Sequence, residues 1–243
     1  MRAQPPVVLW AVPRSVSTAF EKTFTNSPQF SVIHEPFTDC YYFGEERRSD
    51  RYGNARGNRA HSGADACRHI LTVGKRRYFV KELCFQAEPY IDDQFLTRIT
   101  STFIVRRPDV IFASLEHLKP DFTEHEFGFT ALERIWDRVR ELTGSVPTLV
   151  DGERFREDPE GVLSAYCKSI GAAYDPGMLR WADGRIRNWA PHEAESQAKW
   201  HRTLEQSAGI LPPSRRPTPL VAGSRQHVLD EAWRIYRKVT GTS

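Results

Sequence analysis

Residues 7–18 read VVLWAVPRSVST, an apolar run followed by a turn rich in hydroxyl groups. The run at residues 7–12 is typical of a strand that is covered on both faces, since no polar residue alternates with the apolar ones. The segment after it is typical of a helix start, and we expect a helix over residues 15–26. Free N–H groups at a helix N-terminus bind anions with the help of the helix dipole. The stretch therefore predicts a strand, a tight turn and a helix whose start forms an anion site.

Outward from this stretch, short apolar runs alternate with longer amphipathic segments. The runs predict further strands at residues 31–34, 78–83, 102–106 and 147–150. The amphipathic segments predict helices at residues 65–73, 108–118, 127–143, 158–171 and 228–239. We expect the fourth of these helices to begin at the cap residue Asp158 and to end at Gly171. This alternation indicates an α/β fold, a parallel β-sheet flanked by helices on both faces, whose ligands bind at the carboxyl ends of the strands.

The composition is that of a globular protein: of 243 residues, 40% are hydrophobic and 27% are charged. This length suits one domain, which we expect over residues 1–243. The net charge of +3 is too small to predict a nucleic-acid partner. No apolar run approaches the about 20 residues of a membrane span, and the first residues do not have the pattern of a signal peptide. The four cysteines have no CxxC spacing and are interpreted as reduced thiols, so a cytoplasmic location is expected.

Two segments interrupt the alternation. Residues 44–63 are polar and nearly free of aliphatic side chains. Residues 185–219 have no regular pattern and contain five of the sixteen prolines. Both are too long to be plain connections, so we interpret them as lids, substrate loops or disordered segments.

The turn after the first run differs from the phosphate loop of ATPases. In the pattern GxxxxGK[ST], the glycines would fall on Ala11 and Val16 and the lysine on Ser17, and only Thr18 fits. The lysine that would reach the β- and γ-phosphates is missing, and no acidic residue follows an obvious strand as a magnesium partner. A kinase or NTPase is therefore disfavoured, and the turn is either an anion site of another kind or simply a capped helix start.

A second candidate anion site follows the run at residues 102–106. Arg106 ends this run, Pro108 suits the first turn of a helix, and Ser114 lies about two turns further on. We expect Arg106 and Ser114 to converge on one anion, although each alone is also typical of an ordinary surface position.

Together, the two elements resemble the sulfotransferases that use 3′-phosphoadenosine 5′-phosphosulfate (PAPS), of the bacterial small-molecule type. The first family motif, P-[KR]-[ST]-G-[ST]-T, corresponds to residues 13–18 except at Val16, where glycine is usual. This departure predicts a turn whose backbone tolerates a β-branched residue. The second motif, R-x-P-x(5)-S, is matched in full by Arg106, Pro108 and Ser114. Residues 150–172 resemble a third family stretch, with its acidic YED altered to DGE at residues 151–153.

The resemblance implies a P-loop NTPase-like sulfotransferase architecture with PAPS as the sulfuryl donor and no metal. The phosphosulfate would be bound by Arg14, Ser15, Val16, Ser17 and Thr18. The 3′-phosphate would be bound by Arg106 and Ser114. The acceptor would be a hydroxyl or amine of a small or carrier-bound molecule, and its identity and the oligomeric state stay open. A degenerate member that binds the nucleotide without turnover and a kinase-like phosphotransferase are the alternatives.

Sulfuryl transfer also needs a general base that takes the proton of the acceptor. Many relatives have a histidine in a K-T-H segment, where this sequence has KEL at residues 81–83, so Lys81 is kept as a contact of the transferring group but the histidine is absent. Pro36 is expected to hold Glu35 in an extended conformation that faces the cleft. Some sulfotransferases of glycan and bacterial lipid type use a glutamate at this place, and we predict Glu35 as the base. His34 is the alternative, because an imidazole titrates near neutral pH.

Aromatic residues near these positions have two interpretations each. Phe37, Tyr41, Tyr42 and Phe43 form either an apolar wall for the acceptor or part of the core. Trp189, Trp200 and His201 lie where relatives complete the adenine pocket, and none of them is assigned a role.

Overall fold

The apolar run at the start of the chain forms the central strand of a five-stranded parallel sheet in the computed structural model. The structure describes residues 4–52, 62–72, 74–186, 188–189, 194–213 and 223–242. The strand order is β2-β3-β1-β4-β5. The strands are β1 (Val7–Ala11), β2 (Phe30–His34), β3 (Arg77–Leu83), β4 (Thr100–Val105) and β5 (Thr148–Asp151). The predicted parallel α/β fold is thus confirmed, and every strand expected from an apolar run is present.

The register of the sheet brings the candidate residues to one edge. Ala11 at the end of β1 is paired with Leu83 of β3 and Ile104 of β4. Because these strands run in the same direction, the segments that follow them leave the sheet side by side. The candidate anion sites after β1 and β4 therefore lie at the same carboxyl edge, as expected for this class of sheet.

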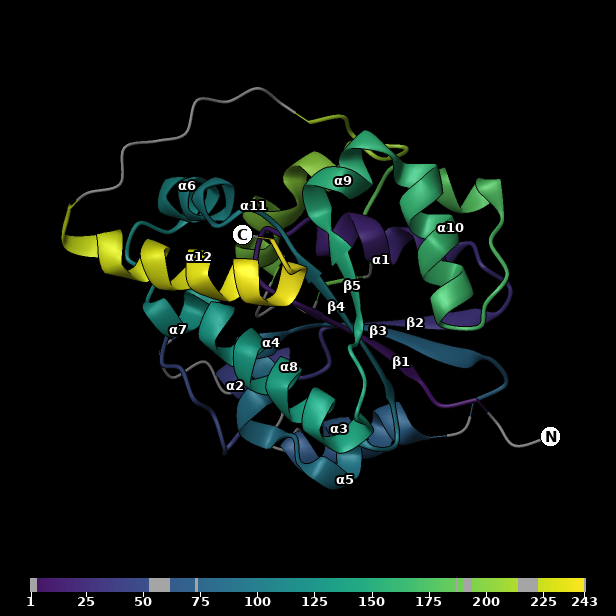
Figure 1. Cartoon of the computed structure of the whole chain (residues 1–243), viewed down its shortest axis with the longest axis horizontal. Helices are drawn as coiled ribbons and strands as arrows, with labels where there is room; N and C mark the ends of the chain where they lie inside the picture. Colours follow the sequence, from purple (N-terminus) through teal and green to yellow (C-terminus); the bar gives the residue numbers. More distant parts are fainter. Residues whose placement is uncertain are drawn as a thin grey trace.

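Helices cover both faces of the sheet (Figure 1). One face is covered by α1 (Ser17–Thr25), α9 (Gly152–Glu157) and α10 (Pro159–Ser169). The other face is covered mainly by α4 (Cys84–Ala87), α6 (Pro108–Leu118), α8 (Phe129–Thr143) and α12 (Gln226–Thr240). The remaining helices are α2 (Thr38–Tyr42), α3 (Gly63–Leu71), α5 (Asp93–Leu96), α7 (Glu124–Phe127), α11 (Ala194–Glu205) and the short 3-10 turns η1 (Glu88–Tyr90), η2 (Pro176–Leu179) and η3 (Gly223–Arg225).

Strand β1 is completely buried because its side chains contribute to two hydrophobic clusters, one on each face of the sheet. Val8 and Trp10 belong to the cluster under α8 and α12. Val7 and Leu9 belong to the cluster under α1 and α10. This is the reason that the run shows no polar alternation.

The ends of helix α10 follow their local sequence signals. The Asp158 side chain accepts a hydrogen bond of 2.9 Å from the Gly161 N–H, and Pro159 occupies the first turn. Gly171 follows the helix with a φ of +67°, a left-handed conformation that glycine adopts without strain. The predicted cap and stop of this helix are confirmed.

The structure describes the two segments that interrupt the pattern only in part, and it shows a helix in the second. In the segment at residues 44–63, positions 53–61 lie outside the described residues. The segment at residues 185–219 is not irregular throughout, because helix α11 occupies its middle; positions 187, 190–193 and 214–219 of it lie outside the described residues. Prolines on both sides of residues 194–205 obscured a helix that the sequence pattern by itself did not show.

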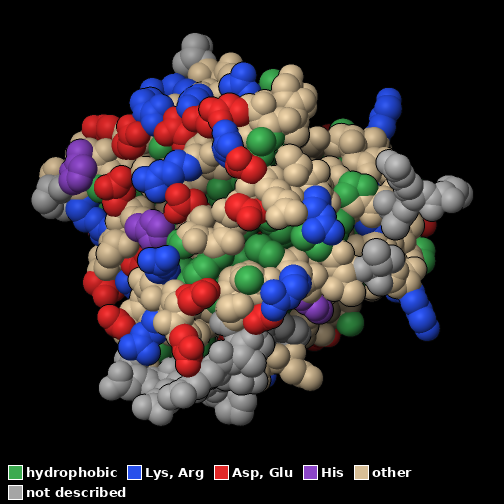
Figure 2. Space-filling view, turned by 90° about the horizontal axis from the view of Figure 1, so that it is seen from below, with side chains coloured by type: hydrophobic (Ala, Val, Ile, Leu, Met, Phe, Trp, Pro, Cys, Tyr) green, Lys and Arg blue, Asp and Glu red, His purple; other side chains and the backbone are tan. Residues whose placement is uncertain are grey.

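On the face shown in Figure 2, basic and acidic side chains are intermingled around a strip of hydrophobic side chains. This face has no extended patch of one charge, in agreement with the small net charge. Within the described ranges, no helix has the length and hydropathy needed to cross a membrane. Cys40, Cys67, Cys84 and Cys167 are all free thiols, as expected.

Candidate functional site

A cavity opens at the carboxyl edge of the sheet, where the segments after β1, β3 and β4 meet. Its lining includes Arg14, Val16, Ser17, Thr18, Glu35, Lys81 and Arg106 among the predicted site residues. The same lining includes side chains of α11 and aromatic residues near α2 and α6. The structure thus brings most of the predicted residues to a single cavity, and leaves His34, Ser15 and Ser114 outside its lining.

The turn between β1 and α1 has a strained backbone. Arg14 has a φ of +62° and Val16 a φ of +71°, both in the left-handed region. A β-branched residue is strongly disfavoured there, so the expectation that the turn would suit valine is wrong. The turn retains the conformation that a glycine adopts freely, with a valine that packs against the cluster below α1.

The start of α1 has the features of an anion site. Helix α1 begins at Ser17, and no side chain caps its first turn. Ser17, Thr18 and Ala19 line the cavity, so the N–H groups of this turn lie at its wall. Ser15 has another role, because its hydroxyl donates a hydrogen bond of 2.7 Å to the Val12 carbonyl and holds the turn from inside.

Arg14 connects the turn to two distant helices. Its Nε donates to the hydroxyl of Ser114 in α6 at 3.0 Å, and its Nη1 donates to the backbone carbonyl of Trp200 in α11 at 2.7 Å. Burial and, to a smaller extent, the nearby charge of Arg106 lower the pKa of Arg14 to about 10. The guanidinium is still protonated at neutral pH and supplies a desolvated positive charge to the cavity.

Arg106 and Ser114 lie at the same edge but do not have a common partner. Ser114 contacts Arg14, whereas Arg106 forms an ion pair with Glu153 at the start of α9. The start of α9 also lies directly against the turn between β1 and α1. Gly152 makes this close packing possible, because a Cβ at this position would lie 2.5 Å from the Ser15 carbonyl oxygen. The alteration to DGE at residues 151–153 thus places an acidic side chain on Arg106 and a glycine against the turn.

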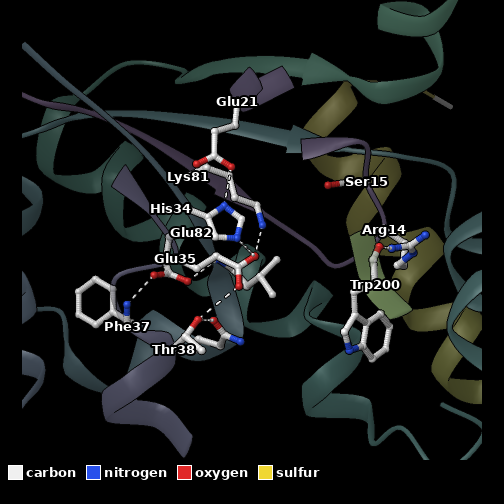
Figure 3. A network of polar contacts seen from close by, with 12 residues as sticks. Arg14, Ser15, Glu21, His34, Glu35, Phe37, Thr38, Lys81, Glu82 and Trp200 are labelled. Atoms are coloured by element: carbon white, nitrogen blue, oxygen red, sulfur yellow. Dashed lines mark hydrogen bonds and ion pairs between the residues drawn. The ribbon is translucent and has the colours of Figure 1, made fainter. Parts of the chain in front are cut away.

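Glu35 and Lys81 form a buried ion pair in the cavity wall (Figure 3). The Glu35 side chain is 7% exposed and the Lys81 side chain 2%, and the Thr38 hydroxyl donates a further hydrogen bond of 3.3 Å to Glu35 Oε2. Burial by itself raises the pKa of the Glu35 carboxyl, but the positive charge of Lys81 and its hydrogen bond to the carboxylate outweigh burial and hold the pKa at about 2. Glu35 is therefore an ionised carboxylate at neutral pH.

The expected extended conformation of Glu35 is wrong. Its φ is +43°, in the left-handed region, in spite of the proline that follows. The Glu35 N–H donates to the Lys81 carbonyl at 2.9 Å, and the Glu35 carbonyl accepts from the Thr38 N–H at 3.1 Å. These two bonds turn the chain sharply at the end of β2, and the turn directs the carboxylate towards Lys81 (Figure 3).

His34 lies behind Glu35, away from the cavity lining. Its Nδ1 is 2.7 Å from Glu21 Oε2, and its Nε2 is 3.8 Å from Glu35 Oε1. Figure 3 shows Glu21, His34 and Glu35 in succession, with the Lys81 ammonium beside the His34 ring and directed at the same Glu35 oxygen, Oε1. The sequence analysis did not identify Glu21 as a site residue. Its place next to Phe20 in a predicted helix could have indicated a buried acidic side chain, which is rare unless it has a partner.

Helix α11 adds residues that the sequence left unassigned. Trp200, His201, Thr203 and Leu204 line the cavity. Burial is the main cause that lowers the pKa of His201 to about 3, so His201 is a neutral imidazole. Its ring stacks on Trp189, with ring centres 5.1 Å apart and planes inclined by 23°. Trp200 lies between two guanidinium groups, those of Arg14 and Arg51, at 6.0 Å and 5.2 Å from its ring centre.

The aromatic residues after Glu35 divide between core and cavity. Phe37, Tyr41 and Phe43 are buried in the core cluster under α8, and Tyr42 both packs there and lines the cavity. Tyr52, Phe85, Leu115 and Phe122 complete an apolar section of the lining, with Gln86, Lys119 and Glu126 as polar neighbours. The cavity lining therefore combines cationic side chains, among them Arg14, Arg51 and Arg106, with a group of aromatic and aliphatic ones.

The chain is similar to known proteins over nearly its whole length. The profile of the sulfotransferase domain matches residues 6–242. Two Arabidopsis thaliana proteins, named branched-chain-amino-acid aminotransferase-like protein 2 and protein 1, are 24% and 25% identical over 213 and 224 residues. The alignments cover 86% and 88% of this chain but only 36% and 38% of those proteins, so the chain spans little more than a third of their length. Among solved structures, a sulfotransferase domain from the curacin biosynthetic pathway is similar in fold, with a TM-score of 0.51, 13% identity and 99% of each chain covered.

Proposed function

Because the chain belongs to the sulfotransferase domain family over nearly its whole length, we propose that it transfers a sulfuryl group from PAPS to a hydroxyl or amine of a small or carrier-bound acceptor. The observation on which this proposal rests is the arrangement of one cavity: an uncapped helix start with Arg14 at one end, and the buried pair of Glu35 and Lys81 in its wall.

The cationic part of the cavity lining fits a phosphosulfate donor. The N–H groups of the first turn of α1 and the hydroxyls of Ser17 and Thr18 are suited to the phosphosulfate oxygens. The guanidinium of Arg14 adds a charge that is already fixed by Ser114 and by the Trp200 carbonyl. Arg106 is suited to the second phosphate, since a guanidinium binds phosphate oxygens in a fork geometry. Trp200 offers an aromatic face near this part of the lining for the purine.

The chemistry requires charge stabilisation and the removal of one proton. The bond between the acceptor oxygen and sulfur forms while the bond between sulfur and the bridging phosphate oxygen breaks. In our proposal, Arg14 and the first-turn amides stabilise the negative charge that grows on the leaving phosphate. Lys81 contacts the sulfuryl oxygens, and Glu35 takes the proton of the acceptor.

The position of Glu35 favours it over His34 as the base. Glu35 lines the cavity, whereas His34 lies behind it and has no place in the lining. The ion pair with Lys81 keeps Glu35 ionised but also weakens it as a base. A negatively charged sulfuryl group that draws Lys81 towards itself would release the carboxylate, so that donor binding would activate the base.

The apolar section of the lining supports an acceptor with an apolar body. Tyr42, Tyr52, Phe85 and Phe122 belong to this section of the lining. The Arg51 guanidinium, which packs on Tyr42 and Tyr52, Gln86, and the ion pair of Lys119 with Glu126 provide polar contacts. We therefore expect aromatic or aliphatic alcohols to be better acceptors than free sugars.

The test is sulfate transfer from radiolabelled PAPS to a panel of 2-naphthol, 1-octanol, 3-hydroxydecanoate and glucosamine. At saturating PAPS, Glu35→Gln is expected to lower kcat about 10²- to 10⁴-fold, the range for loss of a general base. Binding of the product nucleotide 3′,5′-adenosine bisphosphate, measured by calorimetry, should stay within a few-fold of the wild-type value. His34→Gln should retain more activity than Glu35→Gln, and the exposed control Glu160→Gln should be unchanged.

Two results would contradict the proposal in different ways. Near-normal turnover of Glu35→Gln would exclude Glu35 as the base. Binding of the bisphosphate with no transfer to any acceptor would instead favour a nucleotide-binding module without turnover. Thermal stabilisation by magnesium-ATP but not by the bisphosphate would favour the kinase-like alternative.

A further inference from the structure

The pair of Glu21 and His34 is an unusual feature to find behind the proposed base. Glu21 belongs to α1 and is completely buried. Its Oε2 is 2.7 Å from His34 Nδ1, and its Oε1 has no hydrogen-bond partner among the described residues. A buried carboxylate oxygen without a partner is unfavourable by about 1–3 kcal/mol, so a purely structural role does not account for it well.

The contact with Glu21 determines which nitrogen of His34 carries the proton. A carboxylate only accepts hydrogen bonds, so Nδ1 must be the protonated nitrogen of the neutral ring. Nε2 then has a free lone pair, and it too is buried with no hydrogen-bond partner within the described ranges. This lone pair lies 3.8 Å from Glu35 Oε1, the same oxygen that Lys81 contacts. A shift of this oxygen by about 1 Å from Lys81 towards the neighbouring imidazole would bring the two atoms into hydrogen-bond distance.

The charged and titratable groups around His34 come from four elements. Glu21 lies on α1, Glu35 follows β2, Lys81 lies on β3, and His201 lies on α11 with its ring centre 5.6 Å from that of His34. His201 does not compete for the proton, because burial lowers its pKa to about 3. Of the two imidazoles, His34 is the one whose unpartnered nitrogen lies 3.8 Å from Glu35 Oε1.

We propose that Glu21 and His34 form a proton relay behind Glu35, in which Nε2 of His34 accepts the proton that Glu35 removes from the acceptor. Glu21 is a positioning residue in this relay: it fixes the tautomer of His34 and stabilises the imidazolium. The inference rests on the proposed function, since it assigns the fate of the proton in that reaction.

The relay conserves charge and protons. The acceptor proton passes to Glu35 Oε1 and from there to His34 Nε2, which leaves Glu35 ionised and His34 as an imidazolium between two carboxylates. The proton is released to solvent when the sulfated product and the nucleotide leave. The transfer has a direction because Lys81 holds the pKa of Glu35 at about 2, which makes Glu35 a poor resting place for a proton, and because the protonated His34 would lie against the Glu21 carboxylate.

A double-mutant cycle separates this role from a structural one. Glu21→Gln is expected to lower kcat about 10- to 100-fold for the fastest acceptor of the panel above, with a PAPS KM within about 2-fold of wild type. In a His34→Gln background, the same change should have an effect of less than about 2-fold, because Glu21 acts through His34. Equal losses in both backgrounds would overturn the relay, as would full activity of Glu21→Gln.

The pH profile of kcat provides a second readout. The acidic limb should disappear in His34→Gln, because the relay is blocked in wild type once Nε2 is already protonated. In Glu21→Gln this limb should move to lower pH, because the imidazolium has lost its anionic partner. An acidic limb unchanged in both variants would contradict the proposal.

Nitrogen-15 NMR of the wild-type protein tests the premise without any ligand or turnover. At pH 8, the spectrum should show His34 protonated at Nδ1 and bare at Nε2, and the opposite tautomer would overturn the inference. If the tautomer is as expected but no acceptor is sulfated, the proposed function has failed rather than the geometry. If Glu35→Gln is inactive while Glu21→Gln is normal, the relay alone has failed.

Discussion

Three non-glycine residues among the described positions have a left-handed backbone, and all three lie at the site: Arg14, Val16 and Glu35. Such conformations are unfavourable by about 1–3 kcal/mol each and persist only where the surroundings enforce them. Arg14 is held by Ser114 and Trp200, and Glu35 by Lys81 and Thr38. Strain is thus concentrated on the residues that face the proposed donor and acceptor.

Val16 allows this strain to be measured. Val16→Gly is expected to be about 1 kcal/mol more stable than Val16→Ala, because alanine retains a Cβ that is disfavoured at a φ of +71°. Val162 in α10 is a matched control, since it is also half-buried against the same cluster. There the order should reverse, with glycine about 1 kcal/mol less stable than alanine. Denaturant unfolding gives the four values, and the same order at both positions would contradict a left-handed Val16 in solution.

At the scale of elements, the cavity is built where strand ends meet helix starts. The turn from β1 to α1 supplies the anion site, the end of β4 supplies Arg106, and the start of α9 approaches both through Gly152 and Glu153. Helix α11 closes the arrangement, since the Trp200 carbonyl accepts from Arg14. At this edge, side chains from elements far apart in the chain are therefore held in place by contacts with one another.

The ion pair between β4 and α9 leads to a test of donor binding. Glu153 occupies the guanidinium of Arg106, so a phosphate has to displace or share that contact. Glu153→Gln is expected to tighten binding of 3′,5′-adenosine bisphosphate about 3- to 10-fold, or about 0.7–1.4 kcal/mol, because the phosphate no longer has to displace a carboxylate from Arg106 in a largely buried ion pair. Calorimetry measures the change, with the exposed Glu157→Gln in the same helix as control. Weaker binding in Glu153→Gln would mean that Glu153 orients Arg106 instead of competing for it.

At the scale of the whole molecule, two hydrophobic clusters enclose the sheet and a group of buried charges lies at its carboxyl edge. Glu21, Glu35, Lys81 and Glu82 are all buried there. Glu82 differs from Glu35, because no described cation forms an ion pair with it and it instead accepts hydrogen bonds from the Phe37 and Leu83 N–H groups at 2.8 and 2.7 Å. Burial raises its pKa well above 4.5, and the neighbouring charge of Glu35 raises it further. Glu82 therefore binds its proton more tightly in the folded protein than in the unfolded chain.

This difference predicts how the stability of the protein depends on pH. The protonated Glu82 contributes stability that is complete below the unfolded-state pKa of about 4.5 and is lost as the pH rises through the raised folded-state pKa. Glu82→Gln removes this loss, so the difference in melting temperature between the variant and wild type should increase in favour of the variant as the pH rises from about 4.5. Thermal unfolding at a series of pH values, with Glu160→Gln as control, measures it. A difference that does not change with pH would contradict the raised pKa of Glu82.

The sequence by itself determined the strands, the main helices, the order of the motifs and the edge at which the site lies. These properties depend on local periodicity, on caps such as Asp158 and on the shared direction of parallel strands, all of which can be read from neighbouring residues. The sequence also identified Glu35, Lys81, Arg14 and Arg106, which line one cavity.

Only the tertiary structure decided what each of these residues contacts. Arg14 bonds to groups 100 and 186 residues away, Arg106 is paired with Glu153, and His34 is held by a glutamate on another element. It also decided that Glu35 turns against the preference of the residue before a proline. The physical reason is that burial and long-range hydrogen bonds outweigh local conformational preferences of about 1–3 kcal/mol, and no local pattern records which distant group will be the partner.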